Sequence, residues 1–132
     1  MKSSLLLIAT ISICMIIAPT PLFATDDYQS FAGTIEGNWD QWSQKVTLVI
    51  DVQGGDAANV AYKTAASSRV NLKADEESAK GVFTNEKTLV ITLKPSSTGA
   101  RREVILTLNP DGTFNGRHIN RHGDVYGTFK KQ

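Results

Sequence analysis

The sequence predicts an all-β domain, an antiparallel up-and-down meander of about eight or nine short strands closing into a small barrel. A two-layer β-sandwich is the alternative. Three observations predict this fold class. Apolar and polar residues alternate along several segments, which is the period of a half-buried strand. Turn-forming residues separate these segments at intervals of roughly 8–12 residues. No segment after residue 24 has the apolar period of a long helix.

The first three strands follow from this alternation. Residues 31–39 place Phe31, Ile35 and Trp39 on one face, and residues 40–43 turn the chain. Between the second and third strands, residues 53–56 tolerate a positive φ and predict a tight turn. These two strands cover residues 45–52 and 57–63, and their inward side chains are Val46, Leu48, Ile50, Val52, Ala58, Val60 and Tyr62.

The middle of the chain is less regular. Residues 69–73 predict a short fourth strand. Residues 74–79 have helix propensity but no apolar stripe, so we expect one solvated helical turn or a loop there. Residues 81–84 predict the next strand, which ends in a turn at residues 85–86. Residues 88–94 predict another strand, with Leu89, Ile91 and Leu93 inward.

The last part of the chain predicts three more strands, at residues 102–108, 113–118 and 125–130. Asn-Pro-Asp-Gly at residues 109–112 is a strong turn signal between the first two. A meander of this kind removes its free edges by closing into a barrel or by folding as a sandwich. A barrel of about eight strands is just filled by side chains or holds one small ligand.

Residues 1–24 predict a secretory signal peptide. Lys2 precedes an apolar run from Leu5 to Ala18, and Ala24 stands before a polar stretch. We therefore expect one domain at residues 25–132 that is secreted or periplasmic. Lipid attachment at Cys14 and an uncleaved anchor are the alternatives. The apolar run of about 14 residues is short of the ~20 that span a bilayer, so no stable membrane span is expected after cleavage.

Removal of residues 1–24 takes away Lys2 and leaves 13 basic and 13 acidic side chains. This neutral balance argues against a nucleic-acid partner, because such proteins carry a surplus of cations. Cys14 is the single cysteine, so the expected domain has no disulfide, thiolate ligand or cysteine nucleophile. We expect no cofactor.

Two resemblances follow from particular motifs. Gly37-Asn38-Trp39, followed by up-and-down strands, resembles the start of the lipocalin, avidin and fatty-acid-binding superfamily of calycin-type barrels. This implies that Trp39 closes the base of a barrel, although the expected domain is shorter than a lipocalin and lacks its C-terminal helix. Residues 33–39, 46–52 and 106–116 also resemble a small β-barrel module of exported bacterial proteins, which implies a binding or stabilising role and no catalytic residues.

Both histidines, His118 and His122, fall in a polar stretch between two predicted strands. They could bind a metal across a hairpin with Asp124 as a third ligand, since a zinc site needs three or more oriented ligands. The sequence favours a polar hairpin tip over this site.

Four arginines, Arg101, Arg102, Arg117 and Arg121, come from neighbouring strands. Because the planar guanidinium matches carboxylates and phosphates, they could recognise an anionic partner. Otherwise they are exterior residues balanced by Glu103 and Asp124.

Trp42 lies in the first turn, where an exposed indole could stack on a ligand or anchor a partner. Otherwise it caps one end of the barrel.

The sequence contains no Ser-His-Asp pattern, glycine-rich phosphate loop or metal motif, so we expect no enzyme. The leading hypothesis is a non-enzymatic exported binding or interaction protein. A small apolar ligand would lie among Leu48, Ile50, Val60, Leu89, Ile91, Val104 and Leu106. The alternatives are an inhibitor of an exported hydrolase, with residues 25–30 as an arm entering the target, and a metal-dependent enzyme built on His118 and His122.

Overall fold

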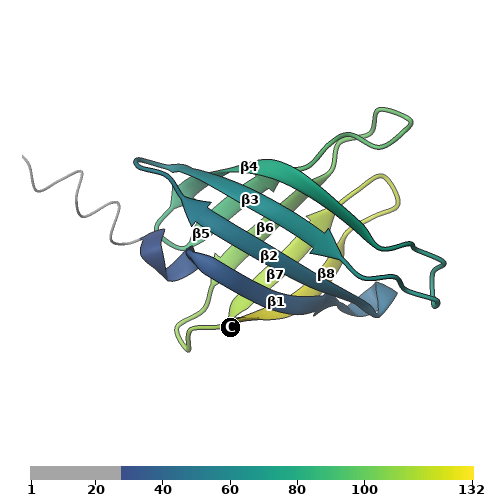
Figure 1. Cartoon of the computed structure of the whole chain (residues 1–132), viewed down its shortest axis with the longest axis horizontal. Coiled ribbons are helices and arrows are strands. Elements are labelled where there is room, and N and C mark those ends of the chain that lie inside the picture. The colour runs from purple at the N-terminus through teal and green to yellow at the C-terminus, as the bar shows by residue number, and fades with distance from the viewer. Residues whose placement is uncertain (1–27) are drawn as a thin grey trace, which may run out of the picture.

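Alternation of apolar and polar residues puts one row of side chains from each strand on the same side of a sheet, and this sheet closes around them. The computed structural model describes residues 28–132, in which the strands form a closed barrel in chain order (Figure 1). The predicted all-β meander and its closure into a barrel are confirmed. The strands are β1 (Gly33–Trp39), β2 (Gln44–Val52), β3 (Ala57–Thr64), β4 (Asp75–Asn85), β5 (Thr88–Thr92), β6 (Glu103–Leu108), β7 (Phe114–Ile119) and β8 (Val125–Lys131).

Every strand pairs antiparallel with the next one, and the barrel closes where β8 pairs with β1. In that closing pair Gly37 lies opposite Phe129, and Ile35 lies opposite Lys131. Two of the predicted tight turns contain a glycine with a positive φ, Gly55 at 66° and Gly112 at 89°. A positive φ favours glycine, because glycine has no Cβ to clash with the backbone. Short connections of this kind keep sequential strands adjacent and fix the meander.

The structure corrects the prediction for the middle of the chain. Residues 69–73 form no strand, and one isolated bridge joins Ser67 to Leu72 in this loop. The segment expected to be a helical turn begins β4, a single strand of 11 residues. It pairs with β3 from Thr64–Asp75 to Ala57–Val82. Extended sheet pairing therefore overrides the local helix propensity.

One end of the barrel is closed by aromatic side chains. A short 3-10 helix, η1 (Gln29–Phe31), precedes β1 and buries Phe31 completely. The Phe31 ring lies 5.1 Å from that of Phe83 and 5.2 Å from that of Phe114, and Tyr28 stacks on Phe83 at 4.0 Å. Of the arm expected at residues 25–30, Tyr28 is therefore packed against the barrel, whereas Gln29 and Ser30 are exposed. Residues 25–27 lie outside the described residues.

The middle of the barrel is filled with side chains. The seven aliphatic residues predicted to line a ligand cavity are between 0% and 3% exposed and belong to one core cluster with Trp39 and Phe129. Glycines make room for the large rings, because a Cβ at Gly37 or Gly116 would overlap Phe129. Close packing of this kind is what stabilises a small domain without disulfides.

The predicted signal peptide, residues 1–24, lies outside the described residues. Among residues 28–132 there is no helix with the length and apolar character needed to cross a membrane.

Candidate ligand pocket at the barrel mouth

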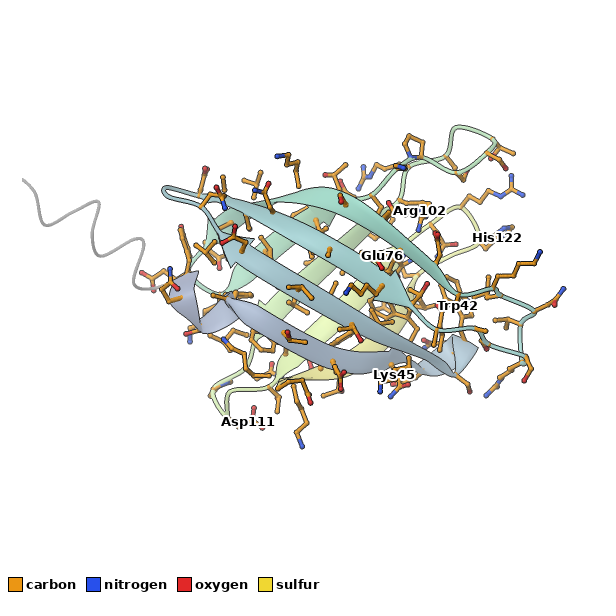
Figure 2. The ribbon with its side chains drawn as sticks, viewed as in Figure 1. Trp42, Lys45, Glu76, Arg102, Asp111 and His122 are labelled. Atoms are coloured by element: carbon orange, nitrogen blue, oxygen red, sulfur yellow. The ribbon has the colours of Figure 1, made fainter. Side chains whose placement is uncertain are left out.

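The barrel has an open end opposite η1, which we call the mouth. The β1–β2, β3–β4, β5–β6 and β7–β8 connections all lie at this end, since alternate connections of an antiparallel meander share an end. Figure 2 shows Trp42 and His122 at the mouth, with Asp111 of the β6–β7 turn at the far end. The mouth therefore collects residues from four separate loops.

A cavity of about 300 Å³ lies in this mouth. It starts where the filled core ends, and its walls combine aromatic rings with polar and charged groups. The residues that line it are Trp42, Gln44, Tyr62, Thr64, Leu72, Lys73, Asp75, Ser96, Arg102, His118, Asn120, Arg121 and His122.

Trp42 is held at the rim by its neighbours. It ends a second 3-10 helix, η2 (Asp40–Trp42), and the following Ser43 adopts the left-handed conformation with φ 47°. The Ser67 hydroxyl, buried in the β3–β4 loop, donates a hydrogen bond to the Trp42 carbonyl. The half-buried Trp42 indole packs against the core and lies 5.4 Å from the His118 ring. The indole thus forms one aromatic wall of the cavity.

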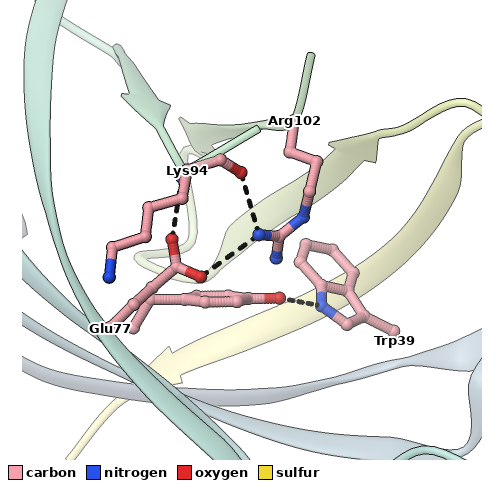
Figure 3. Close-up of polar contacts among 5 residues, drawn as sticks. Trp39, Glu77, Lys94 and Arg102 are labelled. Atoms are coloured by element: carbon pink, nitrogen blue, oxygen red, sulfur yellow. Dashed lines mark hydrogen bonds and ion pairs between the residues drawn. The ribbon is translucent and has the colours of Figure 1, made fainter. Parts of the chain in front are cut away.

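Arg102, which lines the cavity, forms an ion pair with the buried carboxylate of Glu77, and Figure 3 shows the hydrogen bonds of this pair. Arg102 donates from Nη1 to Glu77 Oε2 at 3.2 Å and to the Lys94 carbonyl at 3.0 Å. The other oxygen of Glu77 accepts a hydrogen bond from the Lys94 backbone N–H at 2.9 Å. The Glu77 side chain is only 6% exposed and that of Arg102 is 24% exposed. These bonds fix both the carboxylate and the guanidinium in the mouth.

Tyr62 and His118 form the floor of the cavity. The Tyr62 hydroxyl accepts a 2.8 Å hydrogen bond from Trp39 Nε1, and burial raises the pKa of Tyr62 to about 12. Burial, reinforced by the nearby positive charge of Arg102, lowers the pKa of His118 to about 4. Both side chains are therefore neutral near pH 7 and can act as hydrogen-bond donors.

The structure brings together five of the eight predicted site residues. Trp42, Arg102, Arg121, His118 and His122 line the cavity. Arg101, Arg117 and Asp124 do not line it, and the two arginines are exterior residues with acidic neighbours. Arg101 binds Glu103 at 2.9 Å, and Arg117 binds Asp124.

The hypothetical metal site at the β7–β8 hairpin is not assembled. Within residues 28–132, no cluster of three histidine, cysteine or acidic side chains could hold a metal ion. Asp124 is paired with Arg117 on the outside, whereas His118 points into the barrel. His122 Nε2 accepts a hydrogen bond from Arg121 Nε at 3.1 Å. His118 and His122 thus both line the mouth cavity, whereas Asp124 lies outside it, so the three side chains do not form a metal site.

The cavity also lies nearer the end of the barrel than the sequence predicted. The cavity at the mouth is lined by none of the seven aliphatic side chains predicted for it. Tyr62 and Glu77 were missed as residues of the site. Glu77 shares the inward face of β4 with Ala79, Gly81 and Phe83, and this two-residue period was a usable signal.

No protein-family model matches the chain, and no similar sequence was found among curated proteins. Solved structures share its fold. A redesigned β-barrel has a TM-score of 0.61 at 14% identity, covering 80% of this chain and 95% of that chain. The redesigned β-barrel mFAP1, bound to DFHBI, has a TM-score of 0.59 at 12% identity, with 80% and 98% coverage. A mutant of the fluorescent protein UnaG has a TM-score of 0.51 at 12% identity, with 79% and 97% coverage. The chain therefore adopts the fold of these small β-barrels.

Proposed function

We propose that this chain is an exported, non-enzymatic β-barrel protein that binds one small, largely apolar molecule in the cavity at its mouth. The observation that carries the proposal is the cavity itself. It has about 300 Å³, aromatic walls from Trp42 and Tyr62, and a few fixed polar groups above a filled core. Pockets for small molecules are typically 300–1,000 Å³, concave and mostly apolar, with a small number of placed polar groups.

The fold supports the same proposal. The redesigned barrel mFAP1 has a similar fold and was solved with DFHBI bound. An eight-stranded barrel can hold one small ligand, provided that side chains leave part of its interior free. In this chain the free part is the mouth, because the opposite end is closed by Phe31, Phe83 and Phe114.

Binding can be tested with N-phenyl-1-naphthylamine, a small neutral probe whose fluorescence rises in apolar surroundings. We expect saturable binding at one site, and a roughly tenfold weaker affinity for Trp42→Ala because an aromatic wall is lost. The matched control is Tyr126→Ala. Tyr126 is 49% exposed on β8 and does not line the cavity, so its affinity should equal that of the unchanged protein.

The folded state of each variant is checked by its thermal midpoint, since the Trp42 indole also packs against the core. Absence of probe binding by the folded, unchanged protein would overturn the proposed function. Equal affinities for Trp42→Ala and the unchanged protein would exclude the mouth as the site.

Export is tested separately from binding. The full chain is expressed in a bacterium with two membranes, and the N-terminus of the periplasmic product is sequenced. We expect it to begin at Thr25, after the small residue Ala24. A product that stays in the cytoplasm with Met1 retained would contradict export and leave the binding proposal intact.

A further inference from the structure

The polar groups at the floor of the mouth cavity are mainly hydrogen-bond donors. The Tyr62 hydroxyl already accepts a bond from Trp39 Nε1, so its own hydrogen is directed elsewhere. Gln44, also buried there, uses its amide nitrogen to bind the Ala65 carbonyl at 3.0 Å. Its amide oxygen is a neutral acceptor. Of these two groups, the Tyr62 O–H is left to donate and the Gln44 amide oxygen is left to accept.

The tautomer of His118 follows from its neighbours. The Asn120 side-chain oxygen accepts a 2.8 Å bond from the His122 backbone N–H. This fixes the amide so that its nitrogen donates to His118 Nδ1 at 3.2 Å. A neutral imidazole that accepts at Nδ1 carries its hydrogen on Nε2. His118 therefore supplies a second donor to the cavity, which it lines.

Arg102 has hydrogen-bond donors that its contacts within the protein do not use. Its bonds to Glu77 and to the Lys94 carbonyl both come from Nη1. Its Nε and Nη2 bind no other described residue, and no enclosed side-chain nitrogen in residues 28–132 lacks a partner. These two nitrogens therefore reach open space, and Arg102 lines the cavity. A free Nε–Nη2 edge is the side of a guanidinium that binds a carboxylate with two parallel bonds.

The charges around the cavity favour an anion. Lys73, Arg102 and Arg121 line it, opposed by Asp75 in the lining and by Glu77 behind Arg102. Three cations thus face two carboxylates. Glu77 also acts as a positioning residue, because it holds Nη1 of Arg102 and leaves the other edge free.

The shape of the cavity restricts the rest of the ligand. Aromatic rings form part of its lining: Tyr62 and His118 are nearly parallel at 20° with centroids 6.4 Å apart, and Trp42 lies at 64° to His118. Below this floor the barrel is filled by Leu48, Leu106 and their neighbours. A long alkyl chain would have no interior channel, whereas a short planar ring system would pack against one aromatic face of the lining.

We infer that the ligand is a compact planar aromatic carboxylate, with its carboxylate on Arg102, Tyr62 and His118 and its ring against Trp42. The inference rests on the proposed function and names the ligand class for the same site. It also separates Arg102 from the exterior Arg101 and Arg117, which are paired with acidic neighbours outside the cavity.

The test compares two probes of nearly equal shape, 2-naphthoate and 2-naphthamide, by calorimetric titration at low salt. We expect 2-naphthoate to bind at least about tenfold more tightly, because hydrogen bonds to charged groups are the stronger ones. Decanoate serves as the third probe and should bind more weakly than 2-naphthoate. N-phenyl-1-naphthylamine reports on the pocket independently of charge.

Variants then test whether the Arg102 guanidinium causes the preference for 2-naphthoate over 2-naphthamide. The double variant Glu77→Gln/Arg102→Met removes both charges and so leaves no unpaired carboxylate inside. It should bind 2-naphthoate and 2-naphthamide equally. Arg101→Met removes the neighbouring exterior arginine, and it should keep the full tenfold preference.

Equal binding of 2-naphthoate and 2-naphthamide by the unchanged protein would overturn the inference, and this comparison needs no variant to fold. If N-phenyl-1-naphthylamine still binds in that case, the proposed function stands without a carboxylate ligand. Tighter binding of decanoate than of 2-naphthoate would also overturn the planar class. Failure of N-phenyl-1-naphthylamine to bind would remove the proposed function, and with it this inference.

Discussion

Trp39 Nε1 donates a 2.8 Å hydrogen bond to the Tyr62 hydroxyl across the barrel interior, from β1 to β3. Trp39 is 0% exposed, so its N–H cannot exchange this bond for one to water in the folded state. The bond joins the filled core to the floor of the cavity. It therefore contributes to the stability of the barrel and helps to fix the geometry of the mouth.

Tyr62→Phe should lower the free energy of unfolding by about 1–3 kcal/mol, because it leaves the buried Trp39 N–H without an acceptor. Urea denaturation monitored by circular dichroism measures this change. The control is Tyr126→Phe, since Tyr126 is half exposed on the outside of β8. Its stability should change by no more than ~0.5 kcal/mol. Equal losses in the two variants would contradict a structural role for the buried bond.

The two ion pairs formed by the adjacent arginines Arg101 and Arg102 should differ in their contribution to stability. Glu77→Gln weakens a pair in which the carboxylate is 6% exposed, and should cost about 1.5–3 kcal/mol. Glu103→Gln removes the partner of Arg101, whose side chain is 68% exposed, and should cost about 0–1 kcal/mol. Both variants are compared by urea denaturation at pH 7. A loss for Glu103→Gln as large as that for Glu77→Gln would show that burial does not set the difference.

The sequence predicted the barrel well wherever strong apolar residues alternate. In β2, Val46, Leu48 and Ile50 all face inward, and this pattern has no other good explanation than a half-buried strand. In β4 the inward residues include Glu77, Ala79 and Gly81, which are small or charged. Their weak hydrophobic signal allowed local helix propensity to dominate the prediction, although the strand is fixed by its long-range pairing with β3.

The candidate site was predictable in part, through the same period of two. Arg102 lies two and four residues before Val104 and Leu106, which face inward on β6, so alternation along the chain places it on their side. Arg101 falls on the opposite side. The two-residue alternation therefore distinguishes Arg102, in the mouth, from the exterior Arg101. The Glu77 partner of Arg102 lies 25 residues away in sequence. No local pattern reports such a contact, because it depends on closure of the barrel.

Gly116→Ala should destabilise the barrel by about 1–3 kcal/mol through overpacking. A Cβ at this inward position would overlap the Phe129 ring and approach Trp39. Gly54→Ala is the matched control, because a Cβ there has no neighbour within 4 Å. Thermal unfolding should show a lower midpoint for Gly116→Ala and a nearly unchanged one for Gly54→Ala. Similar midpoints for both variants would mean that the core around Phe129 can relax to accept a methyl group.

The stability of the protein should fall as the pH decreases from about 6.5 to 4, because of His118. The pKa of His118 is lowered from 6.5 to about 4 in the folded protein, chiefly by burial. The unfolded chain therefore binds a proton in this range that the folded protein does not, and stability rises with pH across it. The contribution is complete above pH 6.5 and amounts to on the order of 3 kcal/mol. Arg102, Glu77 and Asp124 are the charged groups that modify it.

Urea denaturation at pH 7 and pH 4.5 measures this dependence, and the two histidines of the chain provide a matched pair of variants. His118→Gln should remove most of the stability difference between the two pH values. His122→Gln should retain it, because His122 is exposed at the β7–β8 turn. If His118→Gln loses as much stability between pH 7 and pH 4.5 as the unchanged protein does, the dependence comes from the carboxylates instead. The neutral state assigned to the His118 imidazole at the floor of the cavity would then need other support.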